Sequence, residues 1–350
     1  MQSKRYADAI LSRTKQIMLL TLLLWAWCGA VPAQTDVPLR PARAATSDVR
    51  PLPLDEPVER PLKAKEQHIY GVNLAARQAL RVGVREQGVD VVLLLFRAVG
   101  DDPQLIEMVD FDDGYGREDL TFVAEQAEEM FVAVVGAEGP LSGDYQLAAQ
   151  VSVATTNDRK RIRAGRLLAE GRALQNIGDA ANLQAALEKW RDALALWQQI
   201  NEPYWAGYAG NLLGLAYNNL GKKQQALQYF QDSLPFRRVT GDRHGEAATL
   251  LNIGNIYSAF GEQQKALQYI QDALALLLVV GDRQGAAYAL NSVGGVYSIL
   301  GEQQKALQYF QEALPLSQAI EDRRAEAMTL HNLGEAYSAL GEKQDRKSVV

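Results

Sequence analysis

A forty-residue repeat in the C-terminal half constrains this chain more than any other feature. Four tyrosines lie forty residues apart, and each has a glycine three residues before it and another four residues after it. The copies are Gly214…Tyr217…Gly221, Gly254…Tyr257…Gly261, Gly294…Tyr297…Gly301 and Gly334…Tyr337…Gly341. A fixed period of this length indicates a solenoid, because each unit is too small to bury its own apolar face and must stack on its neighbours.

Each unit is predicted to be a pair of antiparallel helices. A second motif follows three of the tyrosines, as Ala226-Leu-Gln-Tyr-Phe, Ala266-Leu-Gln-Tyr-Ile and Ala306-Leu-Gln-Tyr-Phe, and a weaker copy starts at Ala186. Small residues such as Gly254 and Ala266 allow two helices to approach closely. Gly261 stands where the first helix must stop, because glycine suits the left-handed conformation that ends many helices. We therefore expect an α-helical solenoid over residues 159–344, with about four and a half helix pairs.

These motifs resemble the tetratricopeptide repeat (TPR). The period of forty residues is longer than the family's usual length of about thirty-four. The proline that usually lies near the end of the repeat is missing from that place, and Pro235 and Pro315 lie inside the second helices instead. The resemblance implies that the first helices line a concave groove, which binds a peptide or helix of a protein partner.

The groove-facing positions of that family can be placed in this sequence. They are Tyr208, Asn211, Leu215 and Asn218, then Leu251, Asn255 and Ser258, then Tyr288, Asn291 and Ser298, and finally His331, Glu335 and Ser338. Asparagine side chains can hydrogen-bond an extended peptide backbone whatever its sequence. For any single position the alternative is an ordinary exposed polar residue. No strong lysine or arginine clamp occurs among these positions, so an acidic peptide terminus is not the favoured ligand.

Residues 62–156 are predicted to form a small β domain. Apolar and polar residues alternate in Ile69–Leu74 and Leu80–Arg85, while the apolar run Val89–Phe96 indicates a central strand. Six or seven short strands separated by glycine turns are typical of an antiparallel β-sandwich or jelly roll. The strings His68-Ile-Tyr-Gly-Val-Asn-Leu and Gly143-Asp-Tyr-Gln-Leu resemble the pre-peptidase C-terminal module. That resemblance implies an accessory module without catalytic activity.

One acidic turn of this domain has the residue types of a cation site. Asp110, Asp112 and Asp113 precede Gly114, and clustered carboxylates on a bent loop are ligands that calcium accepts. The spacing does not fit an EF-hand loop, because Gly114 stands where a further ligand belongs. Aspartate is also common in turns for conformational reasons. A solvated loop is the favoured interpretation, and calcium is the alternative.

The N-terminal segment is predicted to be a signal peptide of residues 1–33. Basic residues lie between Lys4 and Lys15, a mostly apolar run extends from Ile17 to Cys28, and small residues precede a cleavage point after Ala33. An uncleaved membrane anchor is the alternative. The mature protein is therefore expected to be periplasmic or extracellular. Residues 34–61 contain six of the twelve prolines and are predicted to be an extended linker.

Composition argues against nucleic acid and against catalysis. The net charge is −6, and it becomes −9 when the four Lys/Arg and one Asp of residues 1–33 are removed. Such an acidic chain has no overall attraction to nucleic acid. Cys28 is the only cysteine, and His68, His244 and His331 are far apart in the sequence. We therefore expect no catalytic residue, no cofactor and no metal cluster.

The last six residues, Asp345–Val350, break the repeat abruptly, and in one reading frame they match a translated sequencing adapter. We expect that they are not natural sequence and that the gene continues. The order of signal peptide, sandwich and repeats resembles bacterial CHAT-type proteins, which carry a caspase-like protease domain after the repeats. Two functions follow: an exported non-catalytic scaffold that holds a protein partner, which we favour, or the targeting and substrate-recognition part of such a protease.

Overall fold

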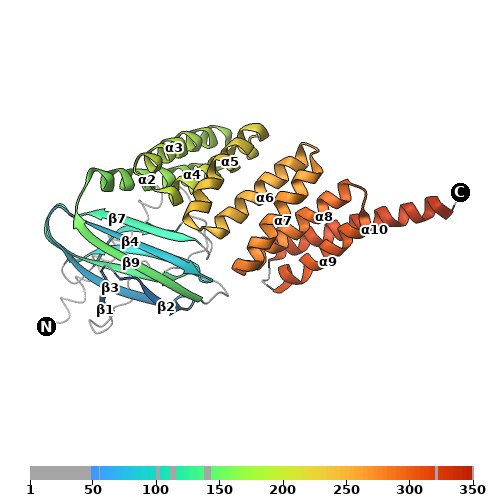
Figure 1. Cartoon of the computed structure of the whole chain (residues 1–350). Coiled ribbons are helices and arrows are strands. Elements are labelled where there is room, and N and C mark those ends of the chain that lie inside the picture. Colours follow the sequence, from blue (N-terminus) through green and yellow to red (C-terminus); the bar gives the residue numbers. More distant parts are fainter. Residues whose placement is uncertain are drawn as a thin grey trace, which may run out of the picture.

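The computed structural model describes residues 49–54, 56–99, 103–110, 116–137, 143–319 and 322–348. In these ranges a β-rich region is followed by nine helices (Figure 1). The order predicted from the sequence, strands first and helices second, is confirmed. The predicted signal peptide and residues 111–115 of the acidic turn lie outside the described residues, as do residues 349–350 of the C-terminal tail.

The β region consists of two sheets. The strands are β1 (Val49–Pro51), β2 (Val58–Leu62), β3 (Gln67–Leu74), β4 (Gln78–Gln87), β5 (Val91–Arg97), β6 (Gln104–Val109), β7 (Arg117–Val123), β8 (Glu128–Gly136) and β9 (Gly143–Val153). One sheet has the order β1-β3-β8-β5-β6 and the other β2-β9-β4-β7. Neighbouring strands are antiparallel except for the β1–β3 pair. Strand β5 lies between β8 and β6, which agrees with the central strand predicted from its apolar run.

The two sheets share one core. Leu80, Val82 and Val84 alternate along β4 and meet Leu93 and Leu95 of β5 there. This alternation places every second side chain inward, as expected for strands with one face on a core.

The hydroxyl of Tyr145 is buried in this core and has hydrogen-bonding partners there. The Tyr145 hydroxyl lies 2.7 Å from the Tyr70 hydroxyl and 2.7 Å from Nδ1 of His68. Burial, together with the Tyr70 hydrogen bond, raises the pKa of Tyr145 far above its ordinary value. The phenol therefore stays neutral and serves as a structural hydrogen-bonding group.

The prediction of a linker over residues 34–61 is wrong for its second half. Strand β2 pairs with β9, and β1 pairs with β3, so residues 49–62 belong to the sheets. Leu62 is only 1% exposed. Pro51 and Pro61 are tolerated because β1 and β2 are edge strands, where the missing backbone N–H need not be paired.

The helices pair in sequence order as hairpins. They are α2 (Thr156–Ile177) with α3 (Ala180–Gln199), α4 (Pro203–Asn219) with α5 (Lys223–Thr240), α6 (Arg243–Ala259) with α7 (Gln263–Val280), α8 (Arg283–Ile299) with α9 (Gln303–Ala319), and then α10 (Arg323–Ser348). As predicted, Gly261 ends its helix in the left-handed region, with φ 81°, and Gly221 and Gly301 do the same. The hairpins α4–α5, α6–α7 and α8–α9 are therefore closed by the same glycine turn.

Gly341 departs from this pattern. The repeat predicts that the first helix of the fourth unit ends there, whereas α10 continues through Gly341 to Ser348. Glycine permits a left-handed turn without requiring it. In the other units the turn leads into a second helix that packs back on the first. Gly341, in contrast, lies inside α10 and makes no turn.

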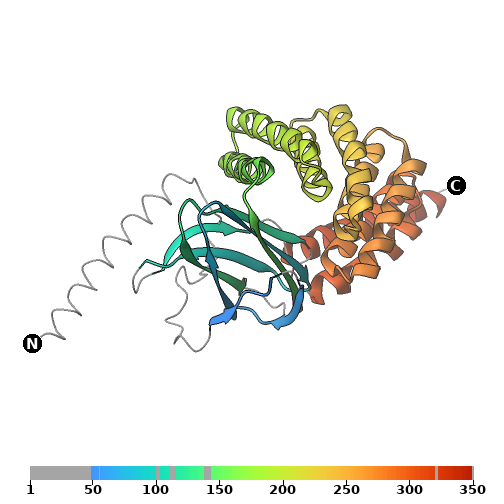
Figure 2. The same ribbon diagram turned by 60° about the vertical axis from the view of Figure 1, so that its left-hand side comes forward.

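The sheets lie against the N-terminal part of the helical array. Strand β7 contacts α2, and the β2-β9-β4-β7 sheet faces the first helices while the later helices extend away from it (Figures 1 and 2). Nε of Arg81 on β4 lies 2.6 Å from Oδ1 of Asp158 in the first turn of α2. Among the described residues no helix combines the length and apolar character needed to cross a membrane.

Candidate partner-binding groove and the adjoining interdomain pocket

The predicted groove residues all lie on the first helices of their units, α4, α6, α8 and α10. The structure places them at three levels of burial. Asn218, Asn255, His331, Glu335 and Ser338 are exposed, Tyr208, Asn211, Leu215, Leu251, Ser258, Tyr288 and Ser298 are half-buried, and Asn291 is buried. The exposed and half-buried groups therefore form a mixed polar and apolar row along successive helices.

Several of these side chains also bond within the protein. The hydroxyls of Ser258 and Ser298 lie 3.1 and 3.2 Å from Oε1 of Gln263 and Gln303, the first residues of the following helices. These serines therefore stabilise the hairpin turns, and a ligand would have to compete for them. At the other end of the array, Nε2 of His331 lies 3.5 Å from Oε1 of Glu335, with both side chains 70% exposed.

The assignment of Asn291 as a ligand contact is wrong. Asn291 is 4% exposed, and its amide nitrogen donates to Oγ1 of Thr329 on α10 at 2.7 Å. Its Oδ1 accepts from the amide of Asn332 at 3.2 Å. A buried amide needs such partners, so Asn291 joins two units instead of facing a ligand.

The contact between first helices alternates in chemistry along the array. Asn211 accepts a hydrogen bond from Thr249 at 3.5 Å, and at the equivalent positions two units later Asn291 donates one to Thr329. In the intervening junction the equivalent positions hold Leu251 and Ala289. Polar and apolar junctions therefore follow one another between units.

The β domain lies at the N-terminal end of this row of residues. Tyr208 packs edge-on against Trp205, with ring centroids 5.5 Å apart, and its hydroxyl accepts a hydrogen bond from Arg172 at 3.2 Å. The same Arg172 nitrogen lies 3.3 Å from the backbone carbonyl of Asp110 in the β domain. Tyr208 is therefore a residue of the domain junction as well as a groove position.

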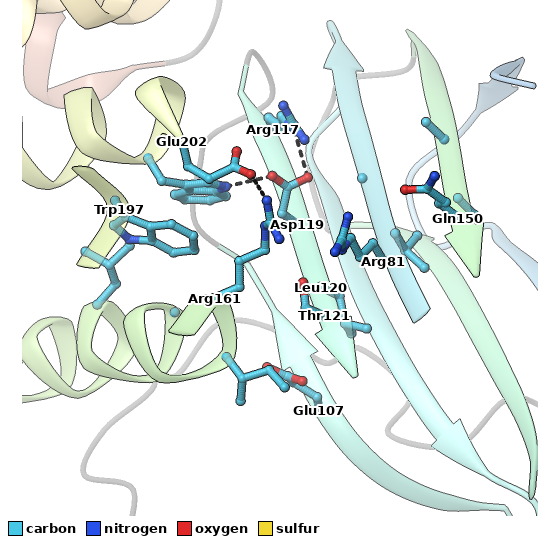
Figure 3. Close-up of a pocket in the computed structure, with 18 of the residues that line it drawn as sticks. Arg81, Glu107, Arg117, Asp119, Leu120, Thr121, Gln150, Arg161, Trp197 and Glu202 are labelled. Carbon is cyan, nitrogen blue, oxygen red and sulfur yellow. Dashed lines mark hydrogen bonds and ion pairs between the residues drawn. The ribbon is translucent and has the colours of Figure 1, made fainter. Parts of the chain in front are cut away.

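A pocket of about 420 Å³ separates the outer face of the β2-β9-β4-β7 sheet from the first helices. The sheet contributes Arg81, Gly83, Asp119, Thr121 and Gln150, and the helical side contributes Arg161, Gly165, Leu168, Trp197, Glu202 and Trp205. Figure 3 shows Arg161, Glu202 and the indole of Trp197 on one side and Asp119, Arg81 and Gln150 on the other.

Two ion pairs of the pocket lie one on each side of the domain boundary, and a hydrogen bond from Trp205 to Asp119 crosses it. Nε of Arg117 lies 2.7 Å from Oδ1 of Asp119, and Nε1 of Trp205 donates to Oδ2 of Asp119 at 2.6 Å. Arg161 forms an ion pair with Glu202. Burial raises the pKa of Asp119, although Arg117 and the Trp205 hydrogen bond oppose the shift. Burial lowers the pKa of Arg117, but Asp119 outweighs this and the pKa is raised, so the guanidinium stays charged.

This arrangement is suited to holding two domains together. Its positive groups are matched by carboxylates, and among the described residues no group of three or more His, Cys, Asp or Glu side chains could hold a metal ion. Burial raises the pKa of Glu107 at the pocket edge, with Arg166 opposing the shift. The chemistry of the pocket is that of ion pairs and aromatic packing.

Sequence reasoning did not find this junction. Arg117, Glu118 and Asp119 are consecutive charged residues in β7, so the polarity pattern does not show that Asp119 faces a second domain. The only sequence signal is the aromatic pair Trp197 and Trp205, which stacks at 5.9 Å between ring centroids. Such a pair is equally typical of a helical core.

Residues 209–278 and 282–345 match the family model of the tetratricopeptide repeat. Similar solved structures include BtubC (BKLC) from P. vanneervenii, which is 20% identical over 56% of this chain and 89% of that one, with a TM-score of 0.39. A putative kinesin light chain of Podosopora anserina with nearly identical TPR-like repeats is 17% identical over 56% and 93%, with a TM-score of 0.42.

Aspartyl phosphate phosphatase F from Bacillus subtilis is 15% identical over 56% of this chain and 51% of that one, with a TM-score of 0.45. No curated protein matches the chain. The family-model match shows that residues 209–278 and 282–345 carry tetratricopeptide repeats, as their motifs predicted.

Proposed function

Because the chain carries tetratricopeptide repeats, we propose that this protein is an exported, non-catalytic scaffold that binds an extended peptide of a protein partner along its first helices. Asn218 and Asn255 support this most directly. Their amides are exposed on consecutive first helices, beside the half-buried Leu215 and Leu251. Amides that can bond a peptide backbone next to apolar side chains that can receive its side chains suit an extended ligand.

The β domain limits where such a peptide lies. Tyr208, Arg172 and Asp110 join the two domains at the N-terminal end of the row. A bound peptide would therefore run over α10, α8 and α6 to Asn218 on α4 and end near the domain junction. The row lacks a lysine or arginine cluster, so we propose a neutral segment instead of an acidic terminus.

The test uses the mature chain and peptides selected on it from an unbiased displayed library. Binding of each selected peptide is measured by isothermal titration. The variant Asn218→Ala/Asn255→Ala is expected to weaken binding about tenfold, since it removes two hydrogen-bonding amides. The variant Gln264→Ala/Gln304→Ala changes two exposed amides on second helices and is expected to leave affinity unchanged. Equal affinities for the parent protein and both double variants would rule out peptide binding at Asn218 and Asn255.

Export is proposed from the features of residues 1–33. Fusing residues 1–40 to a reporter that is active only outside the cytoplasm tests it, and the mature protein is expected to begin at Gln34. The chain's single cysteine, Cys28, lies in this segment. The second candidate function is the targeting and substrate-recognition part of a CHAT-type caspase-like protease, whose Cys/His pair would lie outside this sequence.

We also propose that the β region is a jelly roll. The strand orders β3-β8-β5-β6 and β2-β9-β4-β7 support this class, because each sheet alternates strands from the two ends of the domain. Its proposed role is that of an accessory module, similar to the pre-peptidase C-terminal type, which positions the repeats. Calcium binding at Asp110, Asp112 and Asp113 remains the weaker alternative, and calcium-dependent melting would reveal it.

A further inference from the structure

An arginine occupies an inward-facing position on each of two edge strands of the β region. Strand β1 is an edge of one sheet, and β2 is an edge of the other. Arg50 pairs with Tyr70 of β3, and Arg60 pairs with Tyr145 of β9. Paired residues of neighbouring strands point to the same face of a sheet, and both tyrosines belong to the core between the sheets. Both arginines therefore point towards the gap between the two sheets.

The two arginines flank one hydrogen-bonded group that links the sheets. The hydroxyls of Tyr70 and Tyr145 lie 2.7 Å apart, and the Tyr145 hydroxyl also lies 2.7 Å from Nδ1 of His68. Burial lowers the pKa of His68, a nearby carboxylate opposes this shift, and the charges of both arginines lower the pKa further. Both guanidinium groups therefore act on the same imidazole. We call Arg50, Arg60 and His68 the edge cluster.

The described residues do not neutralise the positive charge of the edge cluster. The side chains of Arg50 and Arg60 form no ion pair with them, and Nε of Arg60 is buried without a hydrogen-bonding partner. Glu66 supplies a carboxylate, whose Oε1 lies 3.6 Å from Nε2 of His68. Two guanidinium charges against one carboxylate leave an excess of positive charge. Arg50 is exposed and Arg60 half-buried, so the cluster is open to solvent on one side.

Protection of the sheet edges does not explain the whole arrangement. Charged side chains on the inner side of edge strands prevent two sheets from joining edge to edge. Such a charge needs only to reach water, whereas a buried donor without a partner costs free energy. Nε of Arg60 is a donor of this kind. An acceptor that enters from the solvent side would complete its hydrogen bonding.

The donors of the edge cluster suit a tetrahedral oxyanion. A planar guanidinium presents paired N–H groups that match two oxygens of a phosphate or sulfate. When Nδ1 of His68 accepts a hydrogen bond from Tyr145, the imidazole proton is on Nε2, which is then a further donor. Two guanidinium charges also attract a dianion more strongly than a singly charged carboxylate.

We propose that the edge cluster binds a phosphate or sulfate dianion between strands β1 and β2. The oxygens of the anion accept hydrogen bonds from the guanidinium groups of Arg50 and Arg60 and from the imidazole of His68. The dianion is either a free ion or a group carried by a larger molecule. The site does not depend on the groove, because its three residues all lie on strands of the β region.

Isothermal titration of the mature chain with inorganic phosphate, sulfate and acetate, at constant ionic strength and neutral pH, tests the proposal. We expect saturable binding of phosphate and sulfate, and binding of acetate that is at least about tenfold weaker. Arg50→Met and Arg60→Met are each expected to weaken phosphate binding at least about tenfold, since each removes a charged pair of donors. Arg85→Met, at an exposed position of β4, is expected to leave it unchanged. Glu66→Gln is expected to strengthen it, because the competing carboxylate is lost.

Further measurements separate the alternatives. Circular dichroism melts without anion check that the variants are folded, and Arg60→Met is expected to be at least as stable as the parent, because it removes an unpaired buried donor. Methyl phosphate that binds as tightly as phosphate would show that the site accepts a group carried by a larger molecule, and much weaker binding would show a site for the free ion. Asn218→Ala/Asn255→Ala is expected to bind phosphate normally. Absent saturation, equal binding of acetate, or unchanged phosphate affinity in Arg50→Met and Arg60→Met overturns the proposal.

Discussion

The indole Nε1 of Trp205 donates a 2.6 Å hydrogen bond to Oδ2 of Asp119, and this bond joins helix α4 to strand β7 across 86 residues of sequence. The other oxygen of the same carboxylate, Oδ1, accepts a hydrogen bond from Nε of Arg117 at 2.7 Å. Asp119 therefore links the β region to the first helices of the array. These helices in turn cover the outer face of the β2-β9-β4-β7 sheet. The two parts are therefore expected to stabilise each other.

Trp205→Phe tests this link. Phenylalanine keeps most of the aromatic packing but cannot donate to Asp119, so the free energy of unfolding is expected to fall by about 1–3 kcal/mol. The measurement is urea unfolding followed by circular dichroism. Trp197→Phe is the matched control, because among the described residues its buried Nε1 has no hydrogen-bond partner to lose. If both substitutions lower the free energy of unfolding equally, the hydrogen bond between Trp205 and Asp119 does not stabilise the contact between the two domains.

The contact between Arg81 and Asp158 predicts a pH dependence. Burial raises the pKa of Asp158, but hydrogen bonds from Arg81 and Thr155 outweigh it and lower the pKa from 3.8 to about 2. Since the folded-state pKa is depressed, the stabilisation is complete above pH 4 and is lost as the pH falls from about 4 to 2. It amounts to about 2 kcal/mol.

Asp158→Asn is therefore expected to lower the melting temperature at pH 7, with the difference from the parent protein shrinking towards pH 2. Melts at constant ionic strength measure this. Asp192→Asn, at an exposed position of α3, serves as control and is expected to leave the melting temperature unchanged at every pH. A constant difference between parent and Asp158→Asn over this range would contradict the assignment.

Two adjacent glycines of α8 are expected to respond oppositely to alanine. A Cβ at Gly294 would meet Phe310 at 2.5 Å, whereas nothing described lies within 4 Å of one at Gly295. Gly294→Ala is expected to destabilise the array by about 1–3 kcal/mol through overpacking. Gly295→Ala is expected to stabilise it by up to about 1 kcal/mol, because alanine has the higher helix propensity. Thermal melts that place the two variants in the reverse order would refute this packing.

The polar junction formed by Asn291 and Thr329 can be converted by mutation into the apolar type formed by Leu251 and Ala289. Asn291→Leu alone leaves the buried Thr329 hydroxyl with one partner fewer and is expected to cost about 1–3 kcal/mol. Asn291→Leu combined with Thr329→Ala recreates the Leu251 and Ala289 junction and is expected to recover much of that loss. A double-mutant cycle measured by chemical denaturation checks the coupling. Strictly additive effects would show that the two side chains act independently.

The sequence alone determined the features that depend on neighbours along the chain. Spacing of glycine, tyrosine and alanine predicted helix hairpins with turns at positions such as Gly261, and alternation predicted strands before helices. These patterns are readable because a helix or strand repeats its environment every few residues.

Tertiary structure decided which side of each element meets a partner. It placed Pro51 and Pro61 on sheet edges instead of in a linker, buried Asn291 between units, and let α10 continue through Gly341. It also brought Trp205 to Asp119. Each outcome depends on contacts between residues far apart in the chain, where burial and hydrogen bonding outweigh local preference, and a one-dimensional pattern does not specify which distant surfaces meet.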